Sequence, residues 1–222
     1  MKYTNKLSIL AAVLLMAASC SPSGRTKSGL DPHAFESEYD GQQTELITIT
    51  NEAGMEACIT NLGGYVVSLM VPDSKGRLHN VLKGCDNVRA YLPENVDGTF
   101  LHGGTDSWTG RSYEVFGVDR SALWLALCSP DGDEAGDLQA YVTYMLTKDN
   151  RLDVYLEVFT ADGVTFDQTN LSGLSCFDQN ALAPNTGIVL TERSTASDSS
   201  IVVLGPNGSF KSRKSYAFSI AE

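Results

Sequence analysis

The sequence predicts an all-β sandwich, on three observations. Apolar residues recur with a period of two, short β-rich segments are separated by turns rich in Gly, Pro, Asp and Asn, and no window keeps an apolar 3.6-residue period. The chain has 222 residues, of which 42% are hydrophobic and 19% are charged, so it can bury a sizeable core without disulfides or a metal. We therefore expect many short strands in two packed sheets.

The clearest strand is the segment 152–159. Asp153 and Glu157 fall on one of its faces, whereas the opposite face carries four apolar residues, Leu152, Val154, Leu156 and Val158. A second β-rich segment, 141–146, precedes it, and the intervening residues 148–150 have the composition of a turn. The pair is expected to form an antiparallel hairpin.

Other elements are expected along the rest of the chain. Residues 65–71 are apolar on both faces, which indicates a strand buried on both sides, and a turn at 72–76 leads into a returning strand at 78–82. One short helical turn is expected at 86–92 and a loop at 194–200. Further strands are expected at 122–128, 188–191, 201–204 and 216–220.

The first 19 residues have the pattern of an export signal. Lys2 and Lys6 precede an apolar stretch of about a dozen residues, which is too short to span a bilayer core of ~30 Å. Small residues before Cys20 favour a bacterial lipobox, with Cys20 lipidated and residues 20–28 serving as a polar tether to a single domain at 29–222. The protein would then be lipid-anchored to a bacterial membrane, in the periplasm or at the cell surface. The alternative is ordinary secretion in which Cys20 has no role.

Charge and cysteine spacing narrow the possible partners. The formal net charge of −11 repels phosphate backbones and argues against nucleic acid. Four further cysteines are widely spaced: Cys58, Cys85, Cys128 and Cys176. They form no CxxC motif, so no zinc site is indicated. Buried free thiols are expected, although one disulfide is possible in an exported protein.

Motifs in a fixed order resemble the aldose 1-epimerase (galactose mutarotase) family, bacterial lipoprotein branch. Leu101-His-Gly-Gly104 matches the family's LHGG sugar-site motif. The remaining similar segments, in chain order, are 29–35, 54–64 with 67–73, 81–91, 129–136 with 142–147, and 204–218. The resemblance implies a galactose-mutarotase-like β-sandwich with an open sugar cleft and the interconversion of α and β anomers of hexoses such as glucose and galactose, without a cofactor.

The family's reaction needs two proton-transfer groups. A carboxylate takes the proton from the anomeric hydroxyl while an imidazole protonates the ring oxygen, and both groups must give and take a proton near neutral pH. The position of the family's acid His is Leu171 here, and that of its base Glu is Gly208. Neither residue can transfer a proton, and losing one partner typically costs 10²–10⁴-fold in rate.

The chain is also truncated where the family binds its sugar. Between Tyr91 and Leu101 the family inserts a few dozen residues with a sugar-contacting Arg, and between Cys176 and Gly187 a segment with a sugar-binding Asp, where only Asp178 stands here. We therefore expect a family member whose epimerase activity is weak or lost. The alternatives are a non-catalytic cell-surface carbohydrate-binding or vestigial module, and a degraded fragment with exposed strand edges.

His102, Gly103 and Trp108 are the candidate substrate-binding residues. The resemblance implies that His102 hydrogen-bonds the sugar, whereas Gly103 lets the backbone approach it and Trp108 can stack on it. The alternative for His102 is a ring satisfied by a neighbouring carbonyl. Tyr113 is expected in the core. Four carboxylates are candidates for a replacement base, each with solvation as its alternative: Asp106, Asp167, Asp178 and Glu192.

The remaining polar residues indicate no metal site. His33 and His79 lie in polar, turn-like surroundings and are expected at the surface. The acidic segment with Asp131, Asp133, Glu134 and Asp137 does not fill the positions of a calcium loop, so a solvated turn is expected. The predicted partner is a small-molecule sugar bound by a monomer, with membrane contact only through the lipid anchor.

Overall fold

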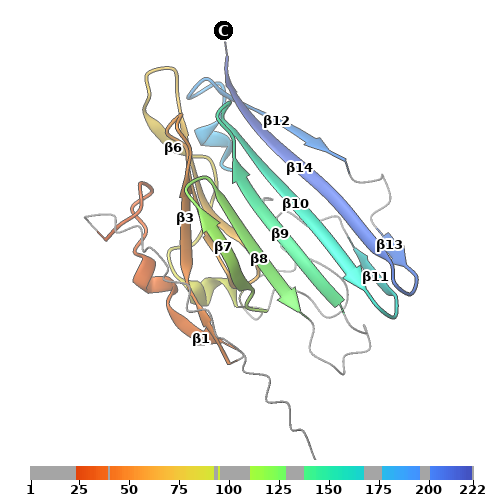
Figure 1. Ribbon diagram of the computed structural model, residues 1–222. Coiled ribbons are helices and arrows are strands. Elements are labelled where there is room, and N and C mark those ends of the chain that lie inside the picture. Colours follow the sequence, from red (N-terminus) through yellow and green to blue (C-terminus); the bar gives the residue numbers. More distant parts are fainter. Residues whose placement is uncertain are drawn as a thin grey trace, which may run out of the picture.

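The computed structural model describes residues 24–39, 41–92, 95, 111–128, 138–167, 177–195 and 201–221, and these form a β-sandwich (Figure 1). A six-stranded sheet has the order β12-β14-β10-β9-β8-β7, and a four-stranded sheet has the order β3-β4-β5-β6. The helical elements in this part of the chain are single 3₁₀ turns, η1 (Pro32–Phe35), η2 (Val88–Tyr91) and η4 (Gln179–Ala181). The predicted all-β sandwich is confirmed.

The large sheet is an antiparallel series of hairpins closed by a late strand. Strands β7 to β10 pair in sequence order, and β14 then returns beside β10, with β12 at the far edge. The strands are β7 (Glu114–Asp119), β8 (Ala122–Cys128), β9 (Leu138–Leu146), β10 (Arg151–Thr160), β12 (Ile188–Ser194) and β14 (Ser209–Ile220).

The small sheet is buried on both faces of its central strands. It contains β3 (Leu46–Thr50), β4 (Glu56–Thr60), β5 (Val66–Pro72) and β6 (Leu78–Asn80). One face packs on the large sheet. The other face carries a second apolar cluster in which Phe35, Tyr65 and Tyr91 pack together. Because both sides are covered, β5 is apolar on both faces, as predicted.

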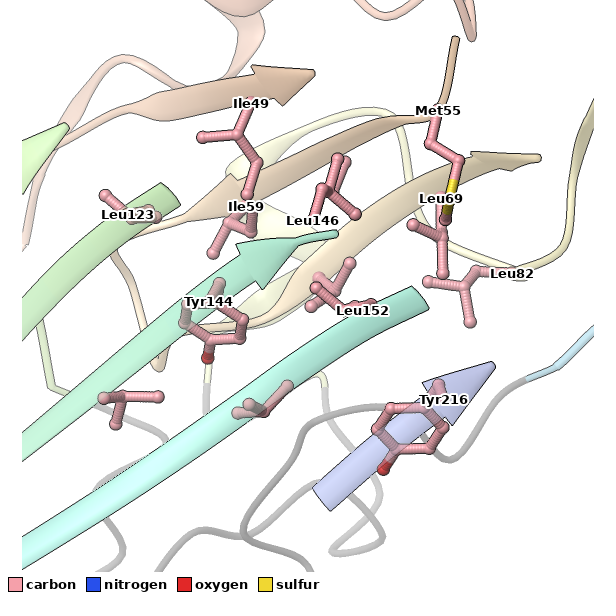
Figure 2. Packing of buried hydrophobic residues seen from close by; sticks show 14 of the residues in the cluster. Ile49, Met55, Ile59, Leu69, Leu82, Leu123, Tyr144, Leu146, Leu152 and Tyr216 are labelled. Carbon is pink, nitrogen blue, oxygen red and sulfur yellow. The ribbon is translucent and has the colours of Figure 1, made fainter. Parts of the chain in front are cut away.

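The main core lies between the two sheets. Leu152, Val154, Leu156 and Val158 are all buried in it, which confirms the face predicted for this strand. Figure 2 shows Leu152, Leu146 and Tyr144 of the large sheet facing side chains of the small sheet such as Ile59 and Leu69. Burying an aliphatic side chain of this size contributes about 1.5–3 kcal/mol, so the alternating pattern is the main stabilising feature of the sandwich.

Two short hairpin-like pairs complete the described fold. Strand β1 (Ser37–Tyr39) pairs with β2 (Gln42–Thr44), and β11 (Val164–Asp167) pairs with β13 (Ile201–Leu204). Val164, Val202 and Leu204 pack against the main core. The second pair therefore extends the core beside the lower ends of β10 and β14 in Figure 1.

Several boundaries differ from the predicted ones. Strand β8 matches the predicted 122–128, and η2 lies within the predicted 86–92, but β14 begins at Ser209 and not at 216 because its polar first half pairs along β10. Strand β12 runs on to Ser194, which was expected in a loop.

Cys58 is buried as predicted, but Cys85 is exposed, because it sits in a polar loop with its N–H bonded to the Tyr91 hydroxyl.

The described N-terminal residues lie against the small sheet. The backbone N–H of Lys27 donates to Glu56 Oε1 at 2.6 Å, and the Ser28 and Ser68 hydroxyls are 3.0 Å apart. Residues 24–28 belong to the predicted tether, so its last residues are docked on β4 and β5; the predicted signal and Cys20 lie outside the described residues. Within the described ranges, no helix has the length and apolar character needed to cross a bilayer.

Candidate functional site

The predicted sugar-contacting residues lie outside the described part of the chain. This applies to His102, Gly103, Trp108 and Leu171, to the acids Asp106 and Asp131–Asp137, and to the side chain of Asp167. The described residues that flank them are fixed to the sandwich. The N–H of Gly63 donates to the Arg111 carbonyl at 2.8 Å, and Phe177 forms a β-bridge with Leu82.

Gly208, the position of the family's base, lies in the tight turn between β13 and β14. Its N–H donates to the Gly205 carbonyl at 2.9 Å, and its own carbonyl accepts from Thr160 N–H at 3.1 Å. A Cβ added at Gly208 would stand 2.6 Å from the Gly205 oxygen and 2.9 Å from Leu204 Cβ. The turn therefore has no room for a side chain unless its backbone shifts, and a carboxylate at position 208 is incompatible with this local geometry.

Asp178, a predicted alternative base, has a structural role. Its Oδ1 accepts from the Asn180 N–H at 3.0 Å at the start of η4 and stands 3.8 Å from Lys83 Nζ. The adjacent Phe177 packs its ring 5.7 Å from that of Tyr216. Tyr216 is eight residues from Gly208 along β14, a separation of about 27 Å at the usual rise of an antiparallel strand. Asp178 therefore cannot replace a carboxylate at position 208.

Glu192 is the other predicted alternative base in the described chain. It is exposed on the edge strand β12, opposite Tyr216 of β14. The histidines in the described part of the chain are His33 and His79, and neither belongs to this strand or to its pairing partner β14. The described residues thus bring no carboxylate and imidazole together across a sugar-sized gap on the large sheet.

His33 and His79 each form a local pair with a carboxylate. His33 is exposed, as predicted, and its Nδ1 lies 3.0 Å from Glu36 Oε1, a hydrogen bond that raises the pKa of the imidazole. His79 is half-buried, and its Nε2 lies 3.1 Å from Asp73 Oδ2. Both pairs sit in or beside short turns, so they account for these histidines without a ligand.

Asp73 organises the turn between β5 and β6. It accepts hydrogen bonds from the N–H groups of Lys75 and Arg77 and from the Arg77 and His79 side chains. Burial by itself would raise the pKa of this carboxyl, but the hydrogen bonds from His79, Arg77 and Lys75 outweigh it and hold the pKa well below its usual range. The hydrogen bonds to Asp73 therefore fix the turn between β5 and β6.

Tyr113 is buried in the core, as predicted. Burial raises the pKa of its phenol well above the ordinary value, and the charges of Tyr144 and Tyr65 add to that effect. The Tyr144 hydroxyl donates to the Gly64 carbonyl across the two sheets.

Within the described ranges, no group of three or more His, Cys, Asp or Glu side chains is arranged to hold a metal.

Sequence relatives of the chain are aldose 1-epimerases. No protein-family model matches the chain. Proteins named aldose 1-epimerase from Escherichia coli K12 and Shigella flexneri are each 28% identical to it over 148 residues, which is 52% of this chain and 43% of the relative. The chain thus matches less than half of each relative's length. Because 52% of 222 residues is roughly 115, the relatives have roughly 33 more residues within the matched stretch.

Solved structures with the same fold come from the same group of proteins. The GalM/aldose epimerase homologue from C. elegans superposes with a TM-score of 0.62 at 11% identity, over 81% of this chain and 100% of that one. Galactose 1-epimerase from Lactobacillus acidophilus NCFM gives a TM-score of 0.60 at 13% identity, over 84% and 97%. At these identities the likeness establishes the galactose-mutarotase-like sandwich fold.

Proposed function

We propose that the chain, which is similar in sequence and in fold to aldose 1-epimerases, is a sugar-binding protein of that family whose ability to interconvert hexose anomers is weak or lost. The observation that carries this proposal is the turn at Gly208. A glycine there lacks the base, and a Cβ would meet the Gly205 oxygen at 2.6 Å, so the backbone of this turn is built for a residue without a side chain.

Two further features support the loss of catalysis. Leu171 stands where the resemblance places the acid imidazole, and a leucine side chain has no proton to give. The roughly 33 residues by which the relatives exceed this chain in the matched stretch agree with the internal deletions expected from the motif spacing. Loss of one proton-transfer partner costs about 10²–10⁴-fold, so loss of both leaves a rate near that of water.

Sugar binding without turnover is the form of the proposal that the LHGG motif favours. His102 keeps the family's sugar-contacting imidazole, and Gly103 keeps the small residue beside it. Residual anomerisation is the second candidate, favoured by the sequence match to proteins named aldose 1-epimerase. The two candidates differ in turnover and share the same hexose ligand.

Polarimetry separates these candidates. Freshly dissolved α-glucose or α-galactose relaxes to its equilibrium rotation, and we expect the same rate with and without the full chain at micromolar concentration. A rate increment that grows in proportion to protein concentration would overturn the loss of catalysis. Calorimetric titration with both hexoses tests binding, and H102A is expected to weaken any heat observed.

We also propose that the protein is lipid-anchored through Cys20. The supporting features are the basic start, the short apolar stretch and the small residues before Cys20. Metabolic labelling with a radioactive fatty acid in a bacterial host is expected to label the wild type and not C20S. Equal labelling of both would contradict the anchor, and a secreted, unlabelled wild type would favour ordinary export.

A further inference from the structure

A compact turn at residues 26–30 lies on the outer side of the small sheet, away from the main core. The Gly29 N–H donates to the Thr26 carbonyl at 2.9 Å, and the Thr26 N–H donates to the Leu30 carbonyl at 3.1 Å. The Leu30 N–H donates in turn to the Thr26 hydroxyl at 3.0 Å. Gly29 has a φ of +86°, a conformation that glycine adopts without strain. Hydrogen bonds within the segment therefore support its shape, and we call it the clip.

The tip of the clip is held to the small sheet by polar contacts. The Lys27 N–H donates to Glu56 Oε1 at 2.6 Å, and the Ser28 N–H bonds to the same carboxylate. The Ser28 and Ser68 hydroxyls are 3.0 Å apart, and Lys27 Nζ donates to the Gly54 carbonyl at 3.2 Å. Two of these contacts converge on Glu56, which is therefore the main attachment point of the clip.

Two titratable groups of β4 lie beneath the clip. Glu56 and Cys58 are on the face of the small sheet opposite to Ala57 and Ile59, which belong to the main core. Glu56 is 4% exposed and Cys58 is 0% exposed, and the Cys58 thiol hydrogen-bonds with the Thr26 hydroxyl of the clip. Burial raises the pKa of both groups, because their hydrogen bonds offset only part of the cost of removing a charged form from water. Both groups would meet solvent if the clip moved away.

Apolar packing begins only after the tip of the clip. Residues 24–29 contain no apolar side chain, and the two cations among them, Arg25 and Lys27, are exposed. Leu30 is the residue of the clip that packs against the second apolar cluster. A segment that is held by hydrogen bonds and exposed to water opens at a lower free energy than packed strands. Opening of the tip therefore leaves both apolar clusters intact, with Leu30 as the hinge.

We propose that the clip opens and closes over Glu56 and Cys58, and that its state sets how far the sandwich can stand from the lipid surface. The link to the lipid surface rests on the anchor proposed at Cys20. A closed clip leaves six residue steps from Cys20 to Thr26, an extended length of about 21 Å, whereas an open clip leaves ten steps to Leu30, or about 35 Å. Closing the clip thus shortens the reach of the sandwich by up to about 14 Å.

Alkylation of Cys58 by iodoacetamide measures the opening of the clip in the full chain carrying C20S, which cannot be lipidated. Peptide mapping by mass spectrometry follows Cys58 separately from the other cysteines. We expect a rate that does not change with urea well below the unfolding transition, because a local opening exposes little surface. A rate that rises with urea in step with global unfolding would overturn the proposal.

Two variants in the same C20S chain open the clip by different routes. E56A removes the acceptor of two N–H groups, and we expect Cys58 to react about tenfold faster, whereas E56Q keeps an acceptor and stays within about threefold of the parent. G29A strains the clip at its positive φ and leaves Glu56 in place, so it should also speed the reaction, and it decides the test if E56A does not fold.

G41A is the matched control for G29A. Gly41 also has a positive φ and no atom within 4 Å of an added Cβ, but it lies in the turn between β1 and β2. We expect Cys58 of G41A to react at the rate of the parent. The proposal is overturned if G29A reacts no faster than G41A, or if a folded E56A reacts at the rate of the parent.

Neutron reflectometry of the lipidated full chain tests the link to the membrane, on a supported bilayer of phosphatidylethanolamine and phosphatidylglycerol. We expect the gap between lipid and protein to be wider in G29A than in the wild type, by at most about 14 Å, and to be unchanged in G41A. An equal gap in G29A and the wild type would overturn this link. A wild type that forms no protein layer, like C20S, would overturn the anchor and the link together, while the alkylation rates judge the clip without either.

Discussion

The two faces of the six-stranded sheet use the same strands for different purposes. On β10, Leu152 and Val158 are completely buried against the small sheet, whereas Tyr155, Glu157 and Phe159 on the opposite face contact solvent and neighbouring charged side chains. Asp153 breaks this simple contrast, since it lies on the outer face yet is only 1% exposed. Alternate residues of β10 therefore face either the apolar core or the outer face of the sheet. Side chains on the outer face can nevertheless bury a charged group, as they do for Asp153.

Removing an inner-face side chain should have the largest effect. L152A deletes a fully buried group in the main core, and we expect the free energy of unfolding to fall by about 2–5 kcal/mol, because transfer and cavity costs add. Urea denaturation followed by circular dichroism measures it. T143A, on the outer face of the adjacent strand, is the control. Equal losses for the two variants would erase the contrast between the faces.

Asp153 should show the second largest effect, although it is on the outer face. It accepts hydrogen bonds from Arg151, Arg213 and Ser215. D153N therefore leaves Arg213 without its carboxylate, whereas Arg151 keeps its ion pair with Asp149. We expect a loss of about 1.5–3 kcal/mol, the usual range for a charged hydrogen bond. A double-mutant cycle with R213Q measures the coupling. No coupling would mean that Asp153 is buried without holding Arg213.

A substitution in the turn that joins β13 and β14 should have a smaller effect. G208A places a Cβ 2.6 Å from the Gly205 oxygen, so the turn must shift, at a cost of about 1 kcal/mol. G187A is the control in which an added Cβ meets no neighbouring atom. Gly187 has a φ of +75° and no atom within 4 Å of an added Cβ, so its substitution reports backbone strain without crowding. If G208A were as stable as the wild type, the turn could accept a side chain.

The smallest expected effect is that of D73N on how the free energy of unfolding changes at acid pH. The pKa of Asp73 is held below its ordinary value of 3.8, so its contribution is present above that pH and is lost as the pH falls toward its folded value. We expect the stability gap between the wild type and D73N to shrink as the pH falls from about 5 to 2, in urea melts at each pH. A constant gap would show that this carboxyl has the same pKa in the folded and the unfolded chain. D162N, at an exposed carboxyl, is the comparison.

The regular alternation of strand residues was predictable from sequence, but the pairing of distant charges was not. Leu152 to Val158 showed the core face because each second residue must face the same side of a strand. The polar first half of β14, with Lys211 and Arg213, has no apolar period, and its strand forms because β10 offers a ladder about 60 residues away. Alternation along β10 also places Asp153 on the outer face correctly. Its burial could not be foreseen, because the side chains that surround it come from β14.

In the candidate site, the residue types were predictable from the sequence, but the packing around them was not. The sequence shows a glycine at position 208, whereas the crowding around its missing Cβ depends on how residues 204–208 fold back on themselves. Asp178 was a reasonable candidate base from its type alone. Its capping role, and the place of the adjacent Phe177 beside Tyr216 at the far end of β14 from position 208, follow from the strand topology. The strand β7 was missed because its bulge at Phe116 interrupts the alternation.

We propose that this sandwich lacks an acid and a base on opposite sides of a hexose, and a crystal structure of the full chain soaked in galactose tests this proposal. We expect galactose beside His102, with neither a carboxylate nor a second imidazole within hydrogen-bond distance of its anomeric hydroxyl. A galactose whose anomeric hydroxyl contacts a carboxylate while an imidazole contacts its ring oxygen would contradict it.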